Sequence, residues 1–449
     1  MRKMLSLLLL LCISLSLPYI PAQGAAAFTN YRTIPGVTQA EIDAIETFKT
    51  DGRSFVYGSI PSTEAFLNEN EQLSGFTVEL CQLLSQLFDI PFVPSVYEWD
   101  SLIQGLENKS IDFSGDFTIT PERKKTYFMS DAIAVRSLAL FYPTGSKMLA
   151  EITAERTPTL GFFSGTIHES QFAESYPGNY HPFYRDTLPE LIDALNAGEI
   201  DTIITDNVAE ASLEDGSGIL CKAYSPLICH SVALSTQNEA LAPILSVFDK
   251  YIRNGGQDEL AVKYAKGLSA YTRFVVRKNF TTEEKNYIDG YVETQEKIPI
   301  ILESGNYPIS FYNKKYKEYQ GIVPDLLKRV TELTGLEFEV VNTPEENWAT
   351  VLARLQNGEA KLISELLFTE SRQNQFLWPD DPSCITHYAL LSRNELPNLS
   401  IYQLLGKRIG VEVNTAYHDF AIQWFPNAEL LTYLSIDDAF LLWTKVRST

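Results

Sequence analysis

Strand-like and helix-like runs of apolar residues alternate along the first half of the chain. Residues 55–57 and 91–96 are strand-like, and the run 76–88 between them carries apolar residues at helical spacing. A further helix is predicted over 99–107 and a buried strand over 111–113. Strands that alternate with helices predict an α/β fold, with a mostly parallel sheet and helices on both of its faces.

Two later runs have the pattern of strands that cross between lobes. The run 132–142 has the pattern of a long strand that carries the chain outward, and a second crossing follows over 230–235. Between them the strand and helix pattern starts again, with strands over 159–162 and 201–205 and a helix over 188–197. We therefore expect two α/β lobes joined by two strands, with a ligand in the cleft between the lobes.

The stretch 112–123 (DFSGDFTITPER) lies where a buried strand ends. It predicts a polar turn and then a helix that begins at Thr120, with Pro121 in the first helical position. Free N–H groups, the Thr118 hydroxyl and the Arg123 guanidinium would converge there, and this arrangement suits a ligand carboxylate. The alternative is that Arg123 forms a surface ion pair and Thr120 only caps the helix.

Four features of the first half recur in the same order 246 to 249 residues further along the chain. The matched pairs are Gly75 and Gly321, Trp99 and Trp348, Thr120 and Thr369 together with Arg123 and Arg372, and Thr166 and Thr415. Four matches in the same order, whose offsets differ by only three residues, indicate two copies of one unit.

A capping-box pattern precedes each copy, at Thr38 and at Thr281, where a Glu follows the Thr three residues later. The boundary between the copies therefore falls near the second capped helix. The expected organisation is a signal peptide over 1–27, a first domain over 38–272 with its second lobe at about 145–232, a linker helix over 273–297 and a second domain over 298–449.

The N-terminal residues have the pattern of an export signal. Arg2 and Lys3 precede an apolar run over 5–17 that is short for a membrane span, and small residues follow it over 22–27. We therefore expect an exported protein that works in the periplasm or on the outer face of a bacterial membrane.

The net charge, the histidines and the cysteines limit which partners, metals and disulfides we expect. The net charge of −21 opposes binding to nucleic acid, although it can also serve only to keep the protein soluble. The five histidines do not combine with cysteines at metal-ligand spacing, so neither a metal site nor a cofactor is expected. Cys221 and Cys229 flank a Ser-Pro turn signal and either bridge a hairpin or stay apart.

Four motifs carry a family resemblance: Gly75-Phe76-x-x-Glu79-Leu80, Leu102-Ile103-x-x-Leu106-x5-Asp112, the run TITPER over 118–123, and Gly165-Thr166. Together they resemble the family 3 extracellular solute-binding proteins, which have the two-lobed type II periplasmic binding fold. The tandem copy is similar to the paired Venus-flytrap sensor regions of bacterial hybrid histidine kinases and diguanylate cyclases. The resemblance covers residues 38–449.

The resemblance implies a site for an amino-acid-like zwitterion in the first domain. Thr118 and Arg123 would hold the α-carboxylate, Trp99 would cover the ligand, and Thr166 would donate to the carboxylate after closure. Asp206 would pair with the α-ammonium. A buried Arg and a buried Asp are each costly alone, so a zwitterion that pairs with both relieves both costs.

Some positions depart from the family pattern. Asp116 adds a negative charge that either favours a cationic ligand or pairs with a nearby Lys or Arg. In the second copy Leu367 replaces the counterpart of Thr118, which weakens the expected site there. That weaker site would consist of Tyr307, Trp348, Arg372 and Thr415. The second copy stops at Thr449, before the counterpart of Asp201, so we expect its second lobe to be truncated.

The first functional hypothesis is a binding protein without chemistry of its own, in which a small amino acid closes the cleft and a membrane signalling module receives the signal. Delivery of the amino acid to an ABC permease is the near alternative. The alternative of another class is an enzyme on the same fold, such as a dehydratase or a peptidoglycan lyase. Its candidate carboxylates would be Asp116, Glu169 and Asp206.

Overall fold

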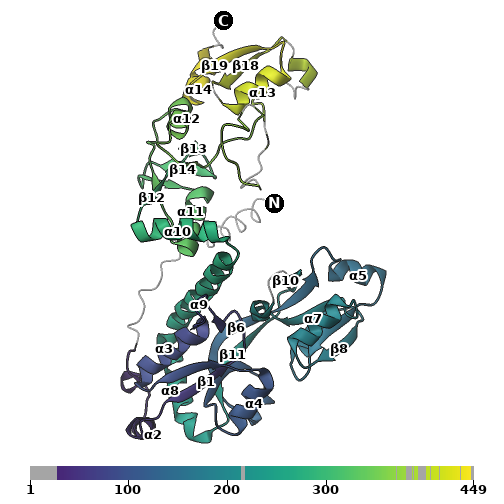
Figure 1. Ribbon diagram of the computed structural model, residues 1–449, viewed down its shortest axis with the longest axis vertical. Coiled ribbons are helices and arrows are strands. Elements are labelled where there is room, and N and C mark those ends of the chain that lie inside the picture. The colour runs from purple at the N-terminus through teal and green to yellow at the C-terminus, as the bar shows by residue number, and fades with distance from the viewer. Residues whose placement is uncertain are drawn as a thin grey trace, which may run out of the picture. The chain divides into compact units, whose positions relative to one another are not determined.

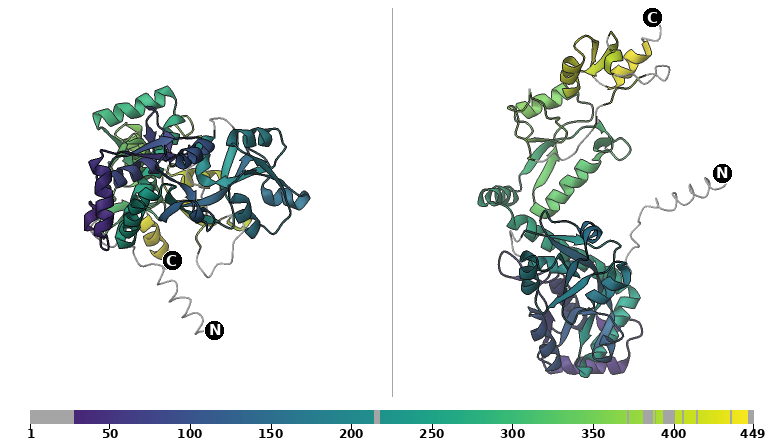
Figure 2. Two further views of the ribbon diagram at one scale, coloured as in Figure 1. Left: turned by 90° about the horizontal axis from the view of Figure 1, so that it is seen from below. Right: turned by 90° about the vertical axis from the view of Figure 1, so that its right-hand side faces the viewer.

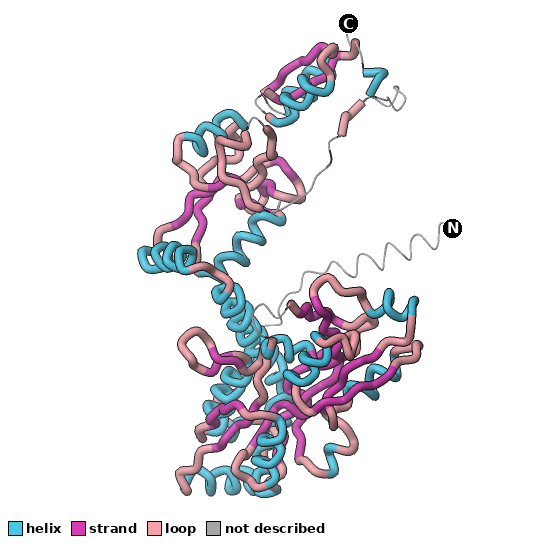
Figure 3. The backbone as a smooth tube through the Cα atoms, turned by 45° about the vertical axis from the view of Figure 1, so that its right-hand side comes forward, coloured by secondary structure: helices cyan, strands magenta, loops and turns pink. Residues whose placement is uncertain are grey.

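The computed structural model describes residues 28–213, 218–370, 372–380, 387, 389–392, 401–404, 406–413, 415–434 and 436–445. The chain divides into two compact units, Met1–Lys278 and Asn279–Thr449, and each is described by itself (Figure 1, Figure 3). The expected signal peptide over 1–27 lies outside the described residues. Within the described ranges, no helix is both long enough and apolar enough to cross a bilayer.

One nine-stranded sheet runs through the first unit, with the strand order β4-β1-β5-β11-β6-β9-β7-β8 and with β10 paired to β6. Strands β1 and β7 are parallel to their neighbours, whereas β6 and β11 are antiparallel to theirs. The strands are β1 Phe55–Ser59, β4 Phe92–Val96, β5 Phe113–Thr118, β6 Phe128–Pro143, β7 Thr159–Phe163, β8 His181–Arg185, β9 Thr202–Asp206, β10 Ile219–Ala223 and β11 Cys229–Thr236. A small hairpin pairs β2 Phe66–Leu67 with β3 Leu73–Ser74.

The helices of this unit alternate with the strands, as predicted. They are α2 Gln39–Thr50, α3 Phe76–Phe88, α4 Trp99–Glu107, α5 Leu149–Glu155, α6 His168–Ser175, α7 Leu188–Asn196, α8 Ala242–Tyr251 and α9 Gln257–Lys278. Short 3-10 turns are η1 Tyr31–Thr33, η2 Arg123–Lys125, η3 Asn207–Ser212 and η4 Glu239–Leu241, and a π-helical turn η5 Ile252–Gly256 joins α8 to α9. Helices α3 and α4 have the bounds that the apolar spacing predicts.

Strand β6 passes through both lobes of the first unit (Figure 1, Figure 2). Its first part, from Phe128 to Ser137, pairs with β11, and its second part, from Leu138 to Pro143, pairs with β9 and β10. The first lobe holds β4, β1 and β5, and the second holds β9, β7 and β8. The expected pair of crossing strands is therefore formed by β6 and β11.

The second lobe buries apolar residues on both faces of its sheet, because successive strand residues point to opposite faces. Leu138, Leu140 and Tyr142 of β6 enter a core that is completed by α5 and α6. Ala139 and Phe141 enter a separate core on the other face, beneath α7. Burial on both faces explains why residues 138–142 form a continuous apolar run in the sequence.

The prediction of a helix that begins at Thr120 is wrong. Strand β5 continues to Thr118, because Phe117 and Thr118 pair with Ala233 and Val232 of the crossing strand β11. Only the single turn η2 follows it. The long-range pairing with β11 thus extends the strand through the expected polar turn, and the expected helix N-terminus is absent from this part of the described chain. Strands β8 and β10 were not predicted.

The possible disulfide between Cys221 and Cys229 is also wrong, and both cysteines are free. They do not face each other across a hairpin. Cys221 lies opposite Phe141 and Cys229 opposite Ser137, so β10 and β11 follow one edge of β6 in succession. Four residues along a strand span about 13 Å, whereas the Cα atoms of a disulfide are at most about 7 Å apart.

The second unit begins with α10 Thr282–Thr294 and contains smaller sheets. Its strands are β12 Lys297–Ile301, β13 Gly305–Asn306, β14 Ser310–Asn313, β15 Glu318–Gln320, β16 Glu337–Val340, β17 Leu362–Ile363, β18 Arg408–Glu412 and β19 Glu429–Tyr433. The sheets have the orders β16-β12-β17, β13-β14-β15 and β18-β19. Its other helices are α11 Ile322–Thr334, α12 Trp348–Gln356, α13 Ala416–Trp424 and α14 Ile436–Lys445, with a 3-10 turn η6 Ile401–Leu404.

The two units repeat local structure as well as sequence. Both predicted capping boxes form, at Thr38 before α2 and at Thr281 before α10. Gly75 caps α3 with a φ of 110°, and Gly321 caps α11 with a φ of 127°. Only glycine adopts such angles readily, so the repeated Gly marks the same chain entry into the same helix.

Candidate functional site

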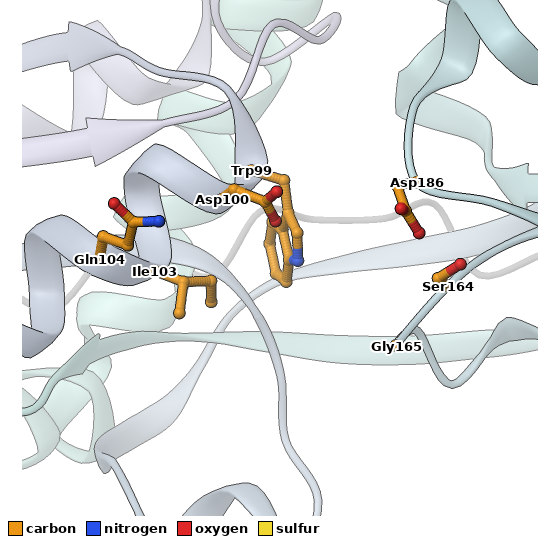
Figure 4. A pocket seen from close by; sticks show the side chains of 7 residues that line it. All are labelled: Trp99, Asp100, Ile103, Gln104, Ser164, Gly165 and Asp186. Carbon is orange, nitrogen blue, oxygen red and sulfur yellow. The ribbon is translucent and has the colours of Figure 1, made fainter.

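A cleft of about 470 Å³ lies between the two lobes of the first unit. Helix α4 of the first lobe contributes Trp99, Asp100, Ile103 and Gln104. The second lobe contributes Ser164, Gly165 and Asp186 from the loops after β7 and β8. Figure 4 shows the Trp99 indole on one side and the side chains of Ser164 and Asp186 on the other. The cleft thus has an aromatic wall and an acidic rim.

Trp99 belongs to a group of aromatic rings on the first lobe. Its ring lies 5.4 Å from the ring of Phe117, which is itself 4.6 Å from the ring of Tyr127. The Arg123 guanidinium lies over the Phe117 ring, 5.5 Å from its centroid. Strand β5 fixes Phe117 in this position, so the strand brings the predicted Trp99 and Arg123 to one surface.

Arg123 is largely buried, and no carboxylate among the described residues forms an ion pair with it. Its Nη1 donates to the Thr118 carbonyl over 3.4 Å, and its backbone N–H donates to Thr120 Oγ1 over 3.1 Å. Burial lowers the pKa of Arg123, while Tyr127 and Asp206 partly oppose this effect. A buried cation without a counter-anion is costly, and an anionic ligand would reduce that cost.

The two predicted threonines occupy different lobes. Thr118 is buried at the end of β5. The Thr166 hydroxyl follows β7 and donates to the Phe163 carbonyl over 3.0 Å, next to Gly165 at the cleft. Thr166 therefore adjoins the residues that line the cleft, whereas Thr118 is not among the lining residues.

Asp116 is part of a buried ion network and not an open carboxylate. Arg136 Nη2 lies 2.6 Å from Asp116 Oδ1 and 2.7 Å from Glu64 Oε2. Tyr264 donates its hydroxyl to Glu64 Oε1 over 3.0 Å, and Asp116 accepts from the Ser59 hydroxyl. Of the two alternatives left open by the sequence, the structure shows the pairing with an arginine.

Asp206 ends β9 and lies against two histidines. Its Oδ1 atom is 3.0 Å from Nε2 of His168 and 2.8 Å from Nε2 of His230, and its Oδ2 atom is 3.7 Å from Nη1 of Arg136. Burial alone would raise the pKa of Asp206, but the histidines and Arg136 outweigh burial and hold it well below its usual range. Asp206 is therefore ionised and surrounded by nitrogen atoms.

Sequence analysis missed Glu64, Arg136, His168 and His230. They come from a loop, from β6, from the first turn of α6 and from β11, and no short spacing links them. The sequence of β6 did contain one signal, because Arg136 is the charged residue of the mostly apolar run 132–142. A buried Arg requires carboxylate partners, and three carboxylates occupy this part of the fold.

The second unit repeats part of this geometry. Arg372 Nη1 lies 3.5 Å from the Leu367 carbonyl, which matches the contact between Arg123 and Thr118. The Thr415 hydroxyl donates to the Glu412 carbonyl over 2.7 Å, which matches Thr166. Trp348 begins α12 as Trp99 begins α4, whereas Tyr307 is largely exposed and lies against Phe311.

The family model for bacterial extracellular solute-binding proteins, family 3, matches this chain over residues 55–266 and again over 298–426. The two matches together cover well over half of the chain, and the protein belongs to this family. The resemblance drawn from the four motifs is confirmed, as are the two-lobed α/β fold and the shorter second copy.

Among curated proteins, the chain is 26% identical over 277 residues to the arginine-binding extracellular protein ArtP of Bacillus subtilis (strain 168), a match that covers 60% of this chain and 99% of ArtP. It is also similar to solved structures. One is a mutant of ArgBP from T. maritima, with 23% identity, coverage of 50% of this chain and 99% of that one, and a TM-score of 0.38. Another is the amino acid ABC transporter substrate-binding protein AbpA from Streptococcus pneumoniae Canada MDR_19A bound to L-arginine, with 16% identity, coverage of 50% and 98%, and a TM-score of 0.41.

Proposed function

We propose that the first unit binds an amino acid in the cleft between its lobes. The observation that carries this proposal is the largely buried Arg123 guanidinium, which has no ion-pair partner in the described chain and lies beside the aromatic wall of the cleft. A ligand carboxylate would supply its missing counter-anion through charge-assisted hydrogen bonds.

The other predicted residues would complete recognition of the zwitterion. The Thr118 side chain would support the carboxylate from the first lobe, and Thr166 would reach it when the lobes close. Trp99 would cover the ligand, and Oδ2 of Asp206 would accept from the ammonium group. Because such contacts come from both lobes, the ligand would bind the closed conformation more tightly than the open one, and this difference in affinity would shift the protein toward closure.

Arginine is the first ligand to test. The relative ArtP is named for arginine binding. In addition, Asp100 and Asp186 line the cleft from opposite lobes, and their negative charges suit a ligand with a cationic side chain.

Isothermal titration of the full chain with arginine and with the other common amino acids tests the proposal. Wild-type protein should bind at least one of them, and Arg123→Ala should weaken that binding more than about a hundredfold, because a hydrogen-bonded charge pair is lost. Lys124→Ala is the matched control, since Lys124 is exposed on the same turn η2. Equal losses in both variants, or no heat with any amino acid, would contradict the proposal.

We infer that the protein is a sensor, in which closure of the lobes around the ligand is transmitted to a membrane signalling module. We also infer that residues 273–297 link the two binding units. Two matched family segments in one chain support this inference, and delivery to an ABC permease is the alternative. Uptake of radiolabelled ligand should be normal in cells that lack the gene if the protein senses, and it should be lost if the protein delivers.

The proposed function involves no chemical step. The three carboxylates considered for catalysis all have other contacts: Asp116 and Asp206 face Arg136, and Glu169 accepts from the hydroxyl groups of Tyr180 and Tyr184. Ligand recovered unchanged after prolonged incubation with the protein would support binding alone, and conversion of the ligand would favour the enzyme hypothesis.

A further inference from the structure

The cluster of His168, Asp206 and His230 brings together three potential ligand atoms from three different elements. One candidate ligand atom from each residue lies within 4.8 Å of the other two. Two imidazole nitrogens and one carboxylate oxygen form a donor set that suits zinc and related divalent transition metals.

The separations within the cluster are about half an ångström shorter than the ligand-ligand distances of a tetrahedral zinc site. Asp206 Oδ1 lies 3.0 Å from His168 Nε2 and 2.8 Å from His230 Nε2. Two ligands at about 2.0–2.2 Å from one zinc ion are about 3.3–3.6 Å apart in tetrahedral geometry, so each histidine nitrogen would move about half an ångström away from Asp206. Small adjustments of the two rings would therefore let all three atoms face one ion.

Hydrogen bonding alone does not satisfy this cluster. All three residues are more than nine-tenths buried. Despite the short distances, Asp206 Oδ1 and His230 Nε2 have no hydrogen-bond partner of acceptable geometry, and Nδ1 of each histidine also lacks one. Buried polar atoms without partners are rare in folded proteins, and one common explanation is an ion.

The surrounding charge also favours a cation. The connected carboxylates and guanidinium are Glu64, Asp116, Asp206 and Arg136, which together carry a net charge of −2. Arg136 approaches Asp206 only to 3.7 Å, because its Nη2 is committed to the other two carboxylates. A divalent cation at the cluster would neutralise this buried charge. Arg123, whose charge interacts with Asp206, is assigned by the proposed function to the ligand carboxylate.

We propose that His168, Asp206 and His230 bind one divalent transition metal ion, with zinc as the first candidate, where the second lobe meets the crossing strand β11. This site replaces the expectation that no metal binds, which rested only on the spacing of residues in the sequence.

Metal content and affinity test the proposal directly. The full chain, stripped with a chelator and free of affinity tags, is titrated with Zn²⁺ at pH 7.5, and Co²⁺ is used as a spectroscopic probe. One equivalent should bind per chain, and cobalt should give visible absorption bands of a low-symmetry site with nitrogen and oxygen ligands.

Substitutions then locate the site. His168→Ala and His230→Gln should each weaken zinc binding more than about tenfold, since even loss of an outer-shell partner costs about 10–100-fold. His181→Ala is the control, because His181 is exposed on β8, and it should bind like wild type. Circular dichroism of the metal-free variants verifies folding. Absence of stoichiometric binding, or equal binding by all variants, would overturn the metal site, whereas loss of amino acid binding in Arg123→Ala reports on the proposed function alone.

Discussion

Arg136 and Asp116 form a buried ion pair, with 2.6 Å between Nη2 and Oδ1, that ties the crossing strand β6 to β5. The same guanidinium also holds Glu64, which lies in the turn between β1 and β2. Because Arg136 is buried against three carboxylates, the fold of the first lobe depends on a group that the family motifs do not contain. Asp116, which the sequence marks as a departure, has a structural role beside the proposed ligand site.

Arg136→Ala should destabilise the first unit strongly. The substitution leaves Asp116 and Glu64 buried without their cation, and breaking a buried pair typically costs about 3–5 kcal/mol. Urea denaturation of the full chain measures the change. Lys147→Ala is the control, because Lys147 and Glu155 are both more than half exposed and such pairs contribute little. If Arg136→Ala lost no more unfolding free energy than the control, the structural role of Arg136 would be contradicted.

Much of the fold could be predicted from the sequence because it depends on local periodicity. Apolar spacing gave both ends of α3 and α4, and the capping boxes at Thr38 and Thr281 gave the start of α2 and α10. These signals lie within a few residues of the element that they define. The internal repeat extended the same information to the second unit.

The parts that could not be predicted depend on contacts between distant segments. Strand β5 runs to Thr118 because β11 pairs with it, and nothing near residue 118 encodes that partner. Asp206 was placed at the site from the family resemblance, but its neighbours His168 and His230 come from other elements. Their meeting follows from the topology and not from any local pattern.

Gly75→Ala should destabilise the first unit, because a Cβ at this position would lie 2.3 Å from the Glu64 carbonyl oxygen, and φ is 110°. An alanine substitution at an incompatible φ costs more than about 1 kcal/mol. Gly290→Ala in α10 is the control, since its Cβ would meet no atom within 4 Å and φ is ordinary. That variant should be neutral or slightly stabilised. Thermal and urea unfolding of both variants measure the difference, and equal effects would show that the cap at Gly75 tolerates a side chain.

Stability of the second unit should fall as the pH rises toward 8. Burial and the neighbouring Glu365 carboxylate raise the pKa of Glu303 from 4.5 to about 8. The folded state therefore binds a proton more tightly than the unfolded chain, and the resulting stabilisation is complete below about pH 4.5 and is lost as the pH rises through about 8.

Glu303→Gln should remove this dependence, because the amide stays neutral. The melting temperature of the variant relative to wild type should increase steadily between pH 5 and pH 8, whereas the exposed Glu293→Gln should follow wild type at every pH. A difference between Glu303→Gln and wild type that does not change with pH would mean that Glu303 titrates normally.

Zinc and the amino acid should bind antagonistically, because both proposals use Asp206. A cation on Oδ1 withdraws negative charge from the carboxylate that would pair with the ligand's ammonium group. Saturating zinc should therefore raise the Kd for arginine several-fold, and arginine should raise the Kd for zinc by the same factor, since coupling between two binding sites is reciprocal. Titrations in both orders measure the two factors. At a zinc concentration that saturates wild type but not His168→Ala, the variant should bind arginine about as well as it does without zinc. A wild-type Kd for arginine that zinc leaves unchanged would exclude Asp206 from one of the two roles.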